Sequence, residues 1–549
     1  MLSYLVFAYQ WVLKRLPKAF SIPLVILLVL YFAFVFPLLA VRAVPKAERW
    51  ISGQVPTVTI PRPTFLDIPK DYSVVGGIVS ALLIIVIAVL GILVSYAIAA
   101  TLYRIILGKP MKHLKLSDPS PLPAAANGTA EANPLAKYER IGIILAGGGA
   151  KGAYQAGAMQ AIHDFLEQHQ ALHKVRMIAG TSIGSWNSLF WLAGLVKRPD
   201  ENKRSVLEQW WHEVDVKSVI RFALYIPLRQ NYLLSPQPWE ETFKRIFNDD
   251  PKISERMLHH IKHAAPGGDH NECTDAMHFY LTRANIALGT LEFTTNRDDL
   301  SNIDPNLPEG VRLRPKATPD AWKAAKSIDD VHNAVFASMD IPPLFKNVTI
   351  DDELFEDGGV VDNLPIRFGT EFENCDLLFI LPLNASFAQP ADQRSIMKRL
   401  FRVIDVRQGV LERNSFKMIY LYNELAALRD AAEKVETAAK IAAAAGSSAG
   451  SGGSNGESAG PSTGATATER ALYRKHKPVQ VFSICPEPEL LINTAEFWKT
   501  AESGQAFRLM NRVTKDELKR FFYYDKPTPD WIRMARVGPQ GEVTYLQDF

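Results

Sequence analysis

The feature of this sequence that most constrains its fold is a short apolar strand that runs into glycines and continues as a helix. The pattern occurs at residues 141–166, and again from Val175 through a helix that begins near Ser185. Strands that alternate with helices along a chain indicate a parallel sheet whose crossover helices cover its faces. Alternating patterns of this kind extend to about residue 385. We therefore predict an α/β fold, a three-layer domain with helices flanking a mainly parallel sheet.

The first glycine run places Gly147, Gly149 and Gly152 in GxGxxG order, which also occurs in dinucleotide-binding domains. Such a domain needs an acidic residue near the end of its second strand to hold the ribose. Here that strand ends in Gly-Thr-Ser-Ile-Gly, and Asp164 and Glu167, although at a plausible distance, lie inside the helix. The motif is therefore weak evidence for a nucleotide cofactor.

The same glycine run is suited to stabilising an oxyanion. Consecutive glycines allow backbone N–H groups to converge on one point, and the N-terminus of the following helix adds positive potential. Such donors stabilise the charge that develops on a carbonyl oxygen during acyl transfer. A tight turn with a purely structural role is the alternative, and glycines alone do not exclude it.

The second strand–helix unit contains a candidate nucleophile. Residues Gly180 to Gly184 read GxSxG, with Ser182 at the centre. Flanking glycines permit the sharp strand–turn–helix bend that lifts a serine hydroxyl clear of the backbone. A chance GxSxG is conceivable in a chain of this length, but the strand–helix context and the upstream glycine loop favour a nucleophile.

A serine nucleophile needs a base. Residues 333–366 contain Asp357 followed by Gly358 and Gly359. Taken alone, Asp-Gly would indicate an ordinary turn. The order of the three motifs, GGGxKG at 147–152, GxSxG at 180–184 and Asp-Gly-Gly at 357–359, is more specific. With Ala337-Ser338, Pro342-Pro343 and Asn363-Leu364-Pro365, it resembles the patatin-like phospholipase family over residues 139–370, with a weaker echo at 478–522.

The resemblance implies a Ser–Asp dyad, without metal or organic cofactor. Ser182 would attack a lipid ester carbonyl and Asp357 would take its proton. The oxyanion hole would be lined by four glycines, with one further donor: Gly147, Gly148, Gly149 and Gly152, and Ile183. Since a carboxylate is a poor base at its solution pKa, we expect burial to raise the pKa of Asp357.

Histidine could in principle complete a triad, because the chain contains 12 histidines. His332 is nearest in sequence to the aspartate segment, and His163 lies on the helix after the glycine loop. Neither has a setting that suggests catalysis, so we interpret both as ordinary surface or packed residues.

Two apolar runs, Phe20–Val41 and Val74–Tyr103, contain no charged residue. Each exceeds the roughly 20 residues that cross a bilayer. Seven Lys and Arg residues flank the outer ends of the runs and five lie in the loop at 42–73. This distribution favours a hairpin with both ends in the cytoplasm. We therefore expect an integral membrane protein with two spans and a cytoplasmic catalytic domain.

The composition shifts along the chain predict six regions. They are a membrane hairpin (1–115), a Pro/Ala/Asn linker (116–137), the catalytic domain (138–385), a helical extension (386–444), a disordered low-complexity insertion (445–469) and C-terminal strand and helices completing the catalytic domain (470–549). An aromatic-rich insert at about 200–275 could form a lid or contact the membrane, but core packing is favoured. Its aromatic residues are Trp210, Trp211, Phe222, Tyr225, Tyr232 and Trp239.

Composition also excludes some functions. A net charge of +3 gives no electrostatic basis for nucleic-acid binding, and the three dispersed cysteines exclude a disulfide scaffold or clustered zinc site. The sequence thus predicts a lipid acyl hydrolase of phospholipase A or lysophospholipase type, acting on membrane phospholipid or lysophospholipid. An acyltransferase on the same dyad and a catalytically idle membrane scaffold remain the alternatives.

Overall fold

The computed structural model describes residues 111, 114–118, 133–200, 202–222, 234–263, 277–297, 322–342, 344–345, 347–384, 396–447, 478–487, 491–494, 496–524 and 532–545. The predicted membrane spans at 20–41 and 74–103 lie outside these residues, as does the low-complexity insertion from residue 448 onward. Within the described part of the chain, no helix is long and apolar enough to cross a membrane.

The chain divides into two compact units, residues 1–108 with 221–235, and residues 109–220 with 236–549. In the first unit the structure describes an antiparallel strand pair, β3 (Arg221–Phe222) with β4 (Leu234–Ser235). All further description concerns the second unit.

The second unit contains one 11-stranded sheet with the order β13-β12-β11-β10-β1-β2-β5-β6-β7, to which β9 and β8 are added beside β5. The strands are β1 (Ile141–Leu145), β2 (Val175–Gly180), β5 (His278–Asn285), β6 (Thr290–Thr295), β7 (Trp322–Ala324), β8 (Val348–Ile350), β9 (Glu353–Asp357), β10 (Leu377–Leu381), β11 (Gln480–Pro486), β12 (Ile532–Val537) and β13 (Val543–Tyr545).

The centre of the sheet is parallel, and antiparallel pairs occur at its margins. The neighbours β12, β11, β10, β1, β2 and β5 all run the same way. Antiparallel pairs join β12 to β13, β5 to both β6 and β9, and β8 to β9, whereas β6 and β7 at one margin are parallel to each other. The predicted α/β class with a mainly parallel sheet is confirmed, and the strands β11 and β12 from the end of the chain belong to the same sheet.

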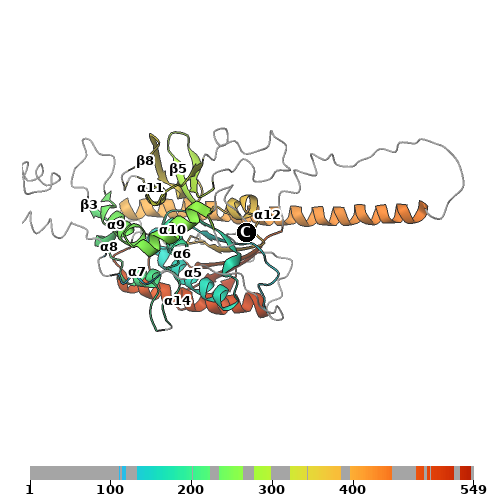
Figure 1. Cartoon of the computed structure of the whole chain (residues 1–549), viewed down its shortest axis with the longest axis horizontal. Coiled ribbons are helices and arrows are strands. Elements are labelled where there is room, and N and C mark those ends of the chain that lie inside the picture. The colour runs from blue at the N-terminus through green and yellow to red at the C-terminus, as the bar shows by residue number, and fades with distance from the viewer. Residues whose placement is uncertain are drawn as a thin grey trace, which may run out of the picture. The chain divides into compact units, whose positions relative to one another are not determined.

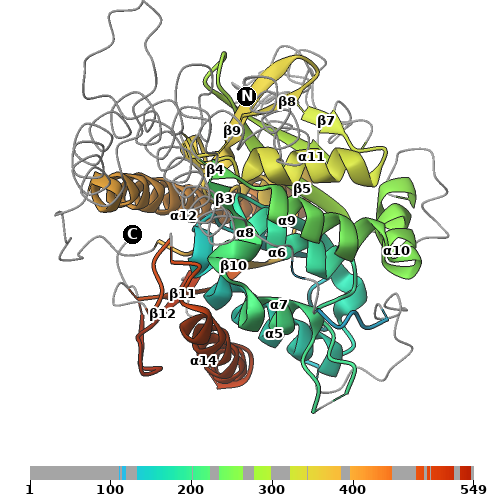
Figure 2. The ribbon, with the colours of Figure 1, turned by 90° about the vertical axis from the view of Figure 1, so that its left-hand side faces the viewer.

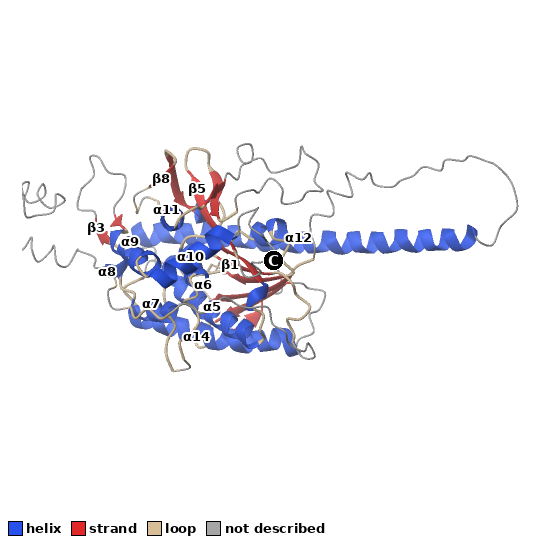
Figure 3. Cartoon of the chain, viewed as in Figure 1, coloured by secondary structure: helices blue, strands red, loops and turns tan. Residues whose placement is uncertain are grey.

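Helices cover the two faces of the sheet (Figures 2 and 3). They are α5 (Gly152–Gln168), α6 (Ile183–Leu192), α7 (Val206–Glu213), α8 (Val216–Val219), α9 (Gln237–Phe243), α10 (Pro251–His263), α11 (Ile328–Ser338), α12 (Ile396–Ser447) and α14 (Thr500–Lys519). Single turns are η2 (Gly149–Lys151), η3 (Leu172–Lys174), η4 (Lys244–Asn248), η5 (Gly358–Val360), η6 (Phe368–Phe372) and η7 (Arg520–Tyr524).

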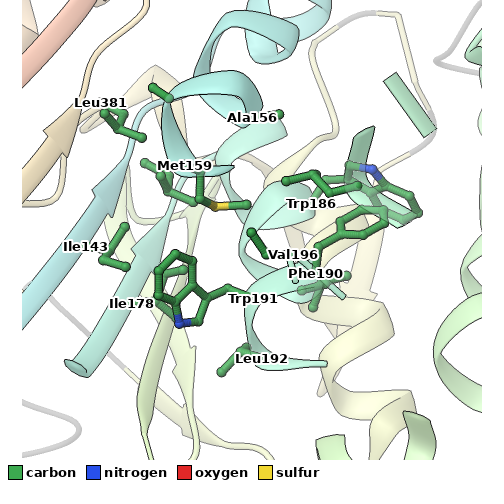
Figure 4. Packing of buried hydrophobic residues seen from close by; sticks show 14 of the residues in the cluster. Ile143, Ala156, Met159, Ile178, Trp186, Phe190, Trp191, Leu192, Val196 and Leu381 are labelled. Atoms are coloured by element: carbon green, nitrogen blue, oxygen red, sulfur yellow. The ribbon is translucent and has the colours of Figure 1, made fainter. Parts of the chain in front are cut away.

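Alternate residues of the central strands enter two different cores, because successive side chains of a strand point to opposite faces. Ile143 and Ile178 face α5 and α6, where they belong to one core with Met159 and Trp191 (Figure 4). Ile144 belongs to the second core, on the face that η6 and α12 cover. Both faces of the parallel sheet are therefore buried, which explains why its strands read as continuous apolar runs.

The three tryptophans of the aromatic insert pack into the first core. Trp210 and Trp239 lie against Trp186 of α6, with ring centroids 5.2 Å away in both cases. Trp211 is also fully buried. The expected core packing is thus confirmed for these tryptophans, whereas the side chain of Phe222 and residues Tyr225 and Tyr232 lie outside the described part of the chain.

The helix α12 lies in the predicted helical extension at 386–444, but it ends at Ser447 and so includes the first residues of the insertion that was predicted to be disordered from residue 445. One side of α12 is buried from Gln408 through Phe416 and Ile419 to Ala426. Residues 431–442 are exposed on all sides, and this part of the helix extends past the sheet in Figure 1. Residues 408–426 of α12 therefore pack against the rest of the unit, whereas residues 431–442 do not.

Candidate active site

Ser182 sits in a strained turn at the carboxyl end of β2, directly before α6. Its backbone has φ 53° and ψ −124°, a conformation that non-glycine residues rarely adopt. A Cβ at Gly180 would lie 2.6 Å from the backbone of Gly184, and one at Gly184 would collide with the carbonyl oxygen of Leu145. Both flanking glycines of GxSxG are therefore required by close backbone packing.

A chain of hydroxyl groups fixes the turn from the side of α11. The Oγ of Ser338 accepts the Ser182 N–H at 2.8 Å and lies 2.9 Å from the Oγ of Ser185. Ser185 in turn donates to the carbonyl oxygen of Gly180 at 2.8 Å. All of these groups are buried, so the hydrogen bonds hold the strained backbone of Ser182 in place.

The sheet brings Asp357 to this turn across 175 positions of sequence. Asp357 ends β9 and pairs opposite Arg283 on β5, which itself runs parallel to β2. The side chain of Ser182 lies close enough to the Asp357 carboxylate to lower its pKa. The hydroxyls of Thr181 and Thr282, 2.7 Å apart, tie the two strand ends together beside it.

The environment of Asp357 makes its carboxylate more basic than in water. Burial raises the pKa of Asp357 from 3.8 to about 7, and the nearby Glu356 charge adds to the rise. The Ser182 side chain and a hydrogen bond from the N–H of Gly359, at 2.8 Å, oppose it. An aspartate with a pKa near neutrality can accept a proton from serine at physiological pH.

The glycine loop follows β1, the strand next to β2, and therefore lies at the same edge of the sheet. Within the described residues, no acceptor takes the N–H groups of Gly147, Gly148 or Gly149. The next two N–H groups are engaged, because Ala150 donates to the carbonyl oxygen of Thr494 and Lys151 to that of Gly148. The first three glycines thus retain unpaired donors at the site.

Gly152 differs from its predicted role as an oxyanion donor. Its N–H is engaged with the carbonyl oxygens of Gly149 and Ala150 in the turn η2. A Cβ here would lie 2.5 Å from Ile183 and 2.8 Å from Trp211. Gly152 therefore allows α5 to pack closely against the serine turn. For Ile183 the N–H remains without an acceptor among the described residues, in keeping with its predicted role as a further donor.

Sequence reasoning missed a buried amide pair that fixes the start of the glycine loop. The side-chain NH₂ of Gln155 donates to the carbonyl oxygens of Ala146 and Leu381, each at 3.0 Å. Asn187 of α6 donates to Gln155 at 3.0 Å. The available signal was the position of both residues within mostly apolar helical segments, where a buried amide needs partners.

Asp340 is a second buried acid beside Ser182 and Asp357. Its carbonyl oxygen accepts the N–H of Asp357 at 2.9 Å, and within the described residues neither carboxylate oxygen makes a hydrogen bond of good geometry. Burial, followed by the charges of Glu356 and Asp357, raises the pKa of Asp340 to about 8, and the backbone of Val348 offsets little of this. Asp340 is therefore mostly neutral at pH 7.

Histidine does not take part in this arrangement. Among the described residues, none forms a hydrogen bond with Ser182 or Asp357. His332 packs against Phe243 and Phe336, and His163 is buried against Trp191. The same part of the chain holds no group of three or more His, Cys, Asp or Glu side chains placed to bind a metal ion.

A serine in a strained turn at the carboxyl edge of a parallel sheet, beside a glycine loop, is typical of acyl hydrolases. Residues 143–368 match the family model described as patatin-like phospholipase, and this part of the chain is a patatin-like phospholipase domain. The family implies hydrolysis of lipid acyl esters.

Two other comparisons add little to this assignment. A search of curated proteins gives no match. Among solved structures, the chain is similar to VipD from Legionella pneumophila, with 14% identity over 69% of this chain and 67% of that one. The TM-score of 0.26 is too low to support any argument about this protein.

Proposed function

We propose that this protein is a membrane-anchored serine lipid acyl hydrolase of phospholipase A or lysophospholipase type. The observation that carries the proposal is a buried Asp357 whose pKa responds to the nearby Ser182 side chain, beside three glycine N–H groups that have no acceptor among the described residues. Base, nucleophile and oxyanion donors are the three components that acyl transfer to a serine requires.

In the proposed first step, Asp357 takes the hydroxyl proton as the Oγ of Ser182 attacks the ester carbonyl of the lipid. The N–H groups of Gly147, Gly148 and Gly149 stabilise the oxyanion that forms, and that of Ile183 is a further donor. Protonated Asp357 then gives its proton to the leaving alcohol, which produces an acyl-serine.

The second step repeats the first with water as the nucleophile. Asp357 takes a proton from the water as it attacks the acyl-serine, and returns it to Ser182 as the fatty acid leaves. The fixed backbone of Ser182 and the hydrogen bond from Gly359 keep nucleophile and base in register throughout.

We further propose that the apolar runs at 20–41 and 74–103 anchor the protein as a two-span hairpin, with the catalytic domain in the cytoplasm. The support is the length of the two uncharged runs and the excess of basic residues at their outer ends. An enzyme anchored in a bilayer shares a surface with phospholipids and lysophospholipids, which favours them as substrates.

The proposal can be tested on the full-length chain in detergent micelles. A fluorophosphonate probe labels serines that are activated as nucleophiles, so wild type should be labelled while Ser182→Ala and Asp357→Asn should not. Release of free fatty acid from phosphatidylcholine and lysophosphatidylcholine should follow the same order. Equal fatty-acid release by wild type and Ser182→Ala would refute the proposal, and acyl transfer to an added alcohol in place of water would identify an acyltransferase.

A further inference from the structure

Several active-site contacts come from α12, which lies outside the part of the chain that matches the family model. Three of its residues, Asp405, Gln408 and Glu412, are spaced three and four apart and so share one side of the helix. Gln408 and Glu412 are buried. This side of α12 is therefore polar where the glycine loop lies nearby, and becomes apolar at Phe416 and Ile419 further along.

Glu412 connects α12 to the carbonyl oxygen of Gly147 through two asparagines. The side-chain NH₂ of Asn363 donates to Glu412 at 2.6 Å and to the carbonyl oxygen of Gly147 at 3.2 Å. The NH₂ of Asn384 donates to the same two acceptors at 3.3 Å, and to Gln408 at 3.0 Å. The second oxygen of Glu412 accepts the backbone N–H of Asn384 at 3.1 Å.

The peptide unit of Gly147 is thus held by its carbonyl oxygen. A peptide plane is rigid, so fixing the carbonyl of Gly147 also fixes the direction of the following N–H, that of Gly148. Gly148 is one of the glycines whose N–H has no acceptor in the described residues. Through the asparagines, Glu412 orients a proposed oxyanion donor without touching it.

A second link joins α12 to the far end of the glycine loop. The buried ammonium group of Lys151 pairs with Asp405 at 3.1 Å and also contacts Asn384. The hydroxyl of Thr494 donates to Asp405 at 2.8 Å, and the carbonyl oxygen of Thr494 accepts the N–H of Ala150. The loop is therefore held at both ends, at Gly147 and at Lys151, by residues of one helix.

The same helix approaches the loop of the proposed base. A Cβ at Gly359 would lie 2.9 Å from the side-chain nitrogen of Gln408 and 2.7 Å from Asn363, and one at Gly147 would lie 2.5 Å from Asn363. Asn363 therefore fills the space between the glycine loop and the Asp-Gly-Gly loop. Neither glycine can carry a side chain without displacing it.

We propose that α12 completes the active site, and that Glu412 is a positioning residue which holds the glycine loop in the conformation that presents its N–H groups to the oxyanion. This inference rests on the proposed function, because it assigns a role in the same acyl transfer. It differs from a purely structural role in predicting that Glu412 affects turnover more than folding or substrate binding.

The hydrogen bonds around Glu412 require its carboxylate to be ionised. The carboxylate accepts three N–H groups, and protonation would convert one of its oxygens into a donor that faces another donor. Burial raises the pKa of Glu412 to about 7, with Lys151 and the asparagine hydrogen bonds opposing the rise. The other titratable groups around it are Asp405, paired with Lys151, and the buried thiol of Cys485 on β11.

The test compares full-length wild type, Glu412→Gln and Asn423→Ala in detergent, with a p-nitrophenyl ester as substrate. Glutamine keeps the size of Glu412 but cannot accept all three N–H groups. We expect kcat to fall about 10- to 100-fold with KM within about twofold, because a misplaced oxyanion donor costs about this much. Asn423 is the matched control, since it is buried on the same helix but bonds the backbone of Val479, away from the site. Its variant should lose stability and keep its kcat.

The pH profile of kcat/KM distinguishes a positioning role of Glu412 from a general loss of structure in the variant. In wild type both Asp357 and Glu412 must be ionised, so log(kcat/KM) should fall with a slope approaching two below about pH 7. In Glu412→Gln only Asp357 titrates, and the slope should be one. Asn423→Ala should retain the slope of the wild type.

Ser182→Ala, measured in parallel, distinguishes the two proposals. If Ser182→Ala is active, the proposed function itself is wrong. If Ser182→Ala is inactive while Glu412→Gln keeps the wild-type kcat and slope, the role of Glu412 is wrong and the dyad stands. Should Glu412→Gln not fold, Asp405→Asn decides the question at a more exposed position: a severalfold lower kcat supports the inference and an unchanged kcat overturns it.

Discussion

Glu373 and Asp357 are both fully buried carboxylates, yet their pKa values move in opposite directions. Glu373 lies at the amino ends of the strands, where Arg140, His278 and Arg297 bond its oxygens at 2.8, 2.7 and 3.1 Å. These partners outweigh burial and lower the pKa of Glu373 to about 2.

Asp357 lies at the carboxyl ends of the strands, where no cation of the described residues pairs with it and burial raises its pKa to about 7. Burial alone therefore does not decide the ionisation of a carboxylate, because the groups that face it can reverse the sign of the shift. One end of the sheet is arranged for stability, and the other holds acids that can exchange protons.

Asp357→Asn should produce the largest functional effect. Asparagine keeps the shape of the side chain but cannot accept the proton of Ser182, so kcat/KM should fall by about 10²- to 10⁴-fold. The thermal midpoint should not fall, because a buried carboxylate without a cation is removed. Ester hydrolysis and calorimetry of the same preparation test both statements, and near-normal hydrolysis would exclude Asp357 as the base.

Glu373→Gln is the matched change at the other end of the sheet. It should lower the stability of the fold and leave the rate of ester hydrolysis nearly unchanged. Removing the carboxylate leaves Arg140 and Arg297 without their counterion and His278 without its carboxylate partner, which costs about 3–5 kcal/mol. Hydrolysis of a soluble ester should remain near the wild-type rate below the melting temperature. Urea unfolding followed by fluorescence measures the loss, and an unchanged midpoint would show that the ion cluster is not stabilising.

The ion cluster of Glu373 should make the free energy of unfolding depend on pH in the acid range. The folded-state pKa of Glu373 is lower than its unfolded value of about 4.5, so its contribution is complete above that pH. This contribution is lost as the pH falls toward about 2. A wild-type protein should therefore lose more free energy of unfolding than Glu373→Gln between pH 5 and pH 2. Parallel urea titrations at several pH values measure this loss. If the free energy of unfolding changed equally with pH in the two proteins, the prediction would be contradicted.

Asp340→Asn should give the smallest effect, with the opposite sign. The folded-state pKa of Asp340 is about 8, above the unfolded value of 3.8, so the native state binds the extra proton between these values. Its contribution to stability consequently falls as the pH rises through this window. Asparagine removes that penalty and should raise the thermal midpoint by a few degrees at pH 8–9, with little gain at pH 4. A gain of equal size at both pH values would point to better packing instead.

The sequence predicted the α/β class because apolar strands followed by glycines and helices are local patterns. The sequence also identified Ser182 and the Asp-Gly-Gly loop as candidate active-site residues, because each motif is a short pattern contained in one segment of the chain. The C-terminal strand and helices predicted at 470–549 were visible for the same reason, and they include β11 and α14. The helical extension predicted at 386–444 corresponds to α12, although the helix continues to Ser447.

Only the tertiary structure decided what each buried polar group faces. Gly152 and Gly149 look alike in the sequence, but the N–H of Gly152 is used within a turn and that of Gly149 is not. Nothing in the sequence distinguishes Asp340, Glu373 and Glu412 from other acidic residues. Their burial and their partners appear only in the folded structure. The physical reason is that desolvation and charge depend on neighbours that are distant in sequence, and no local pattern specifies those neighbours.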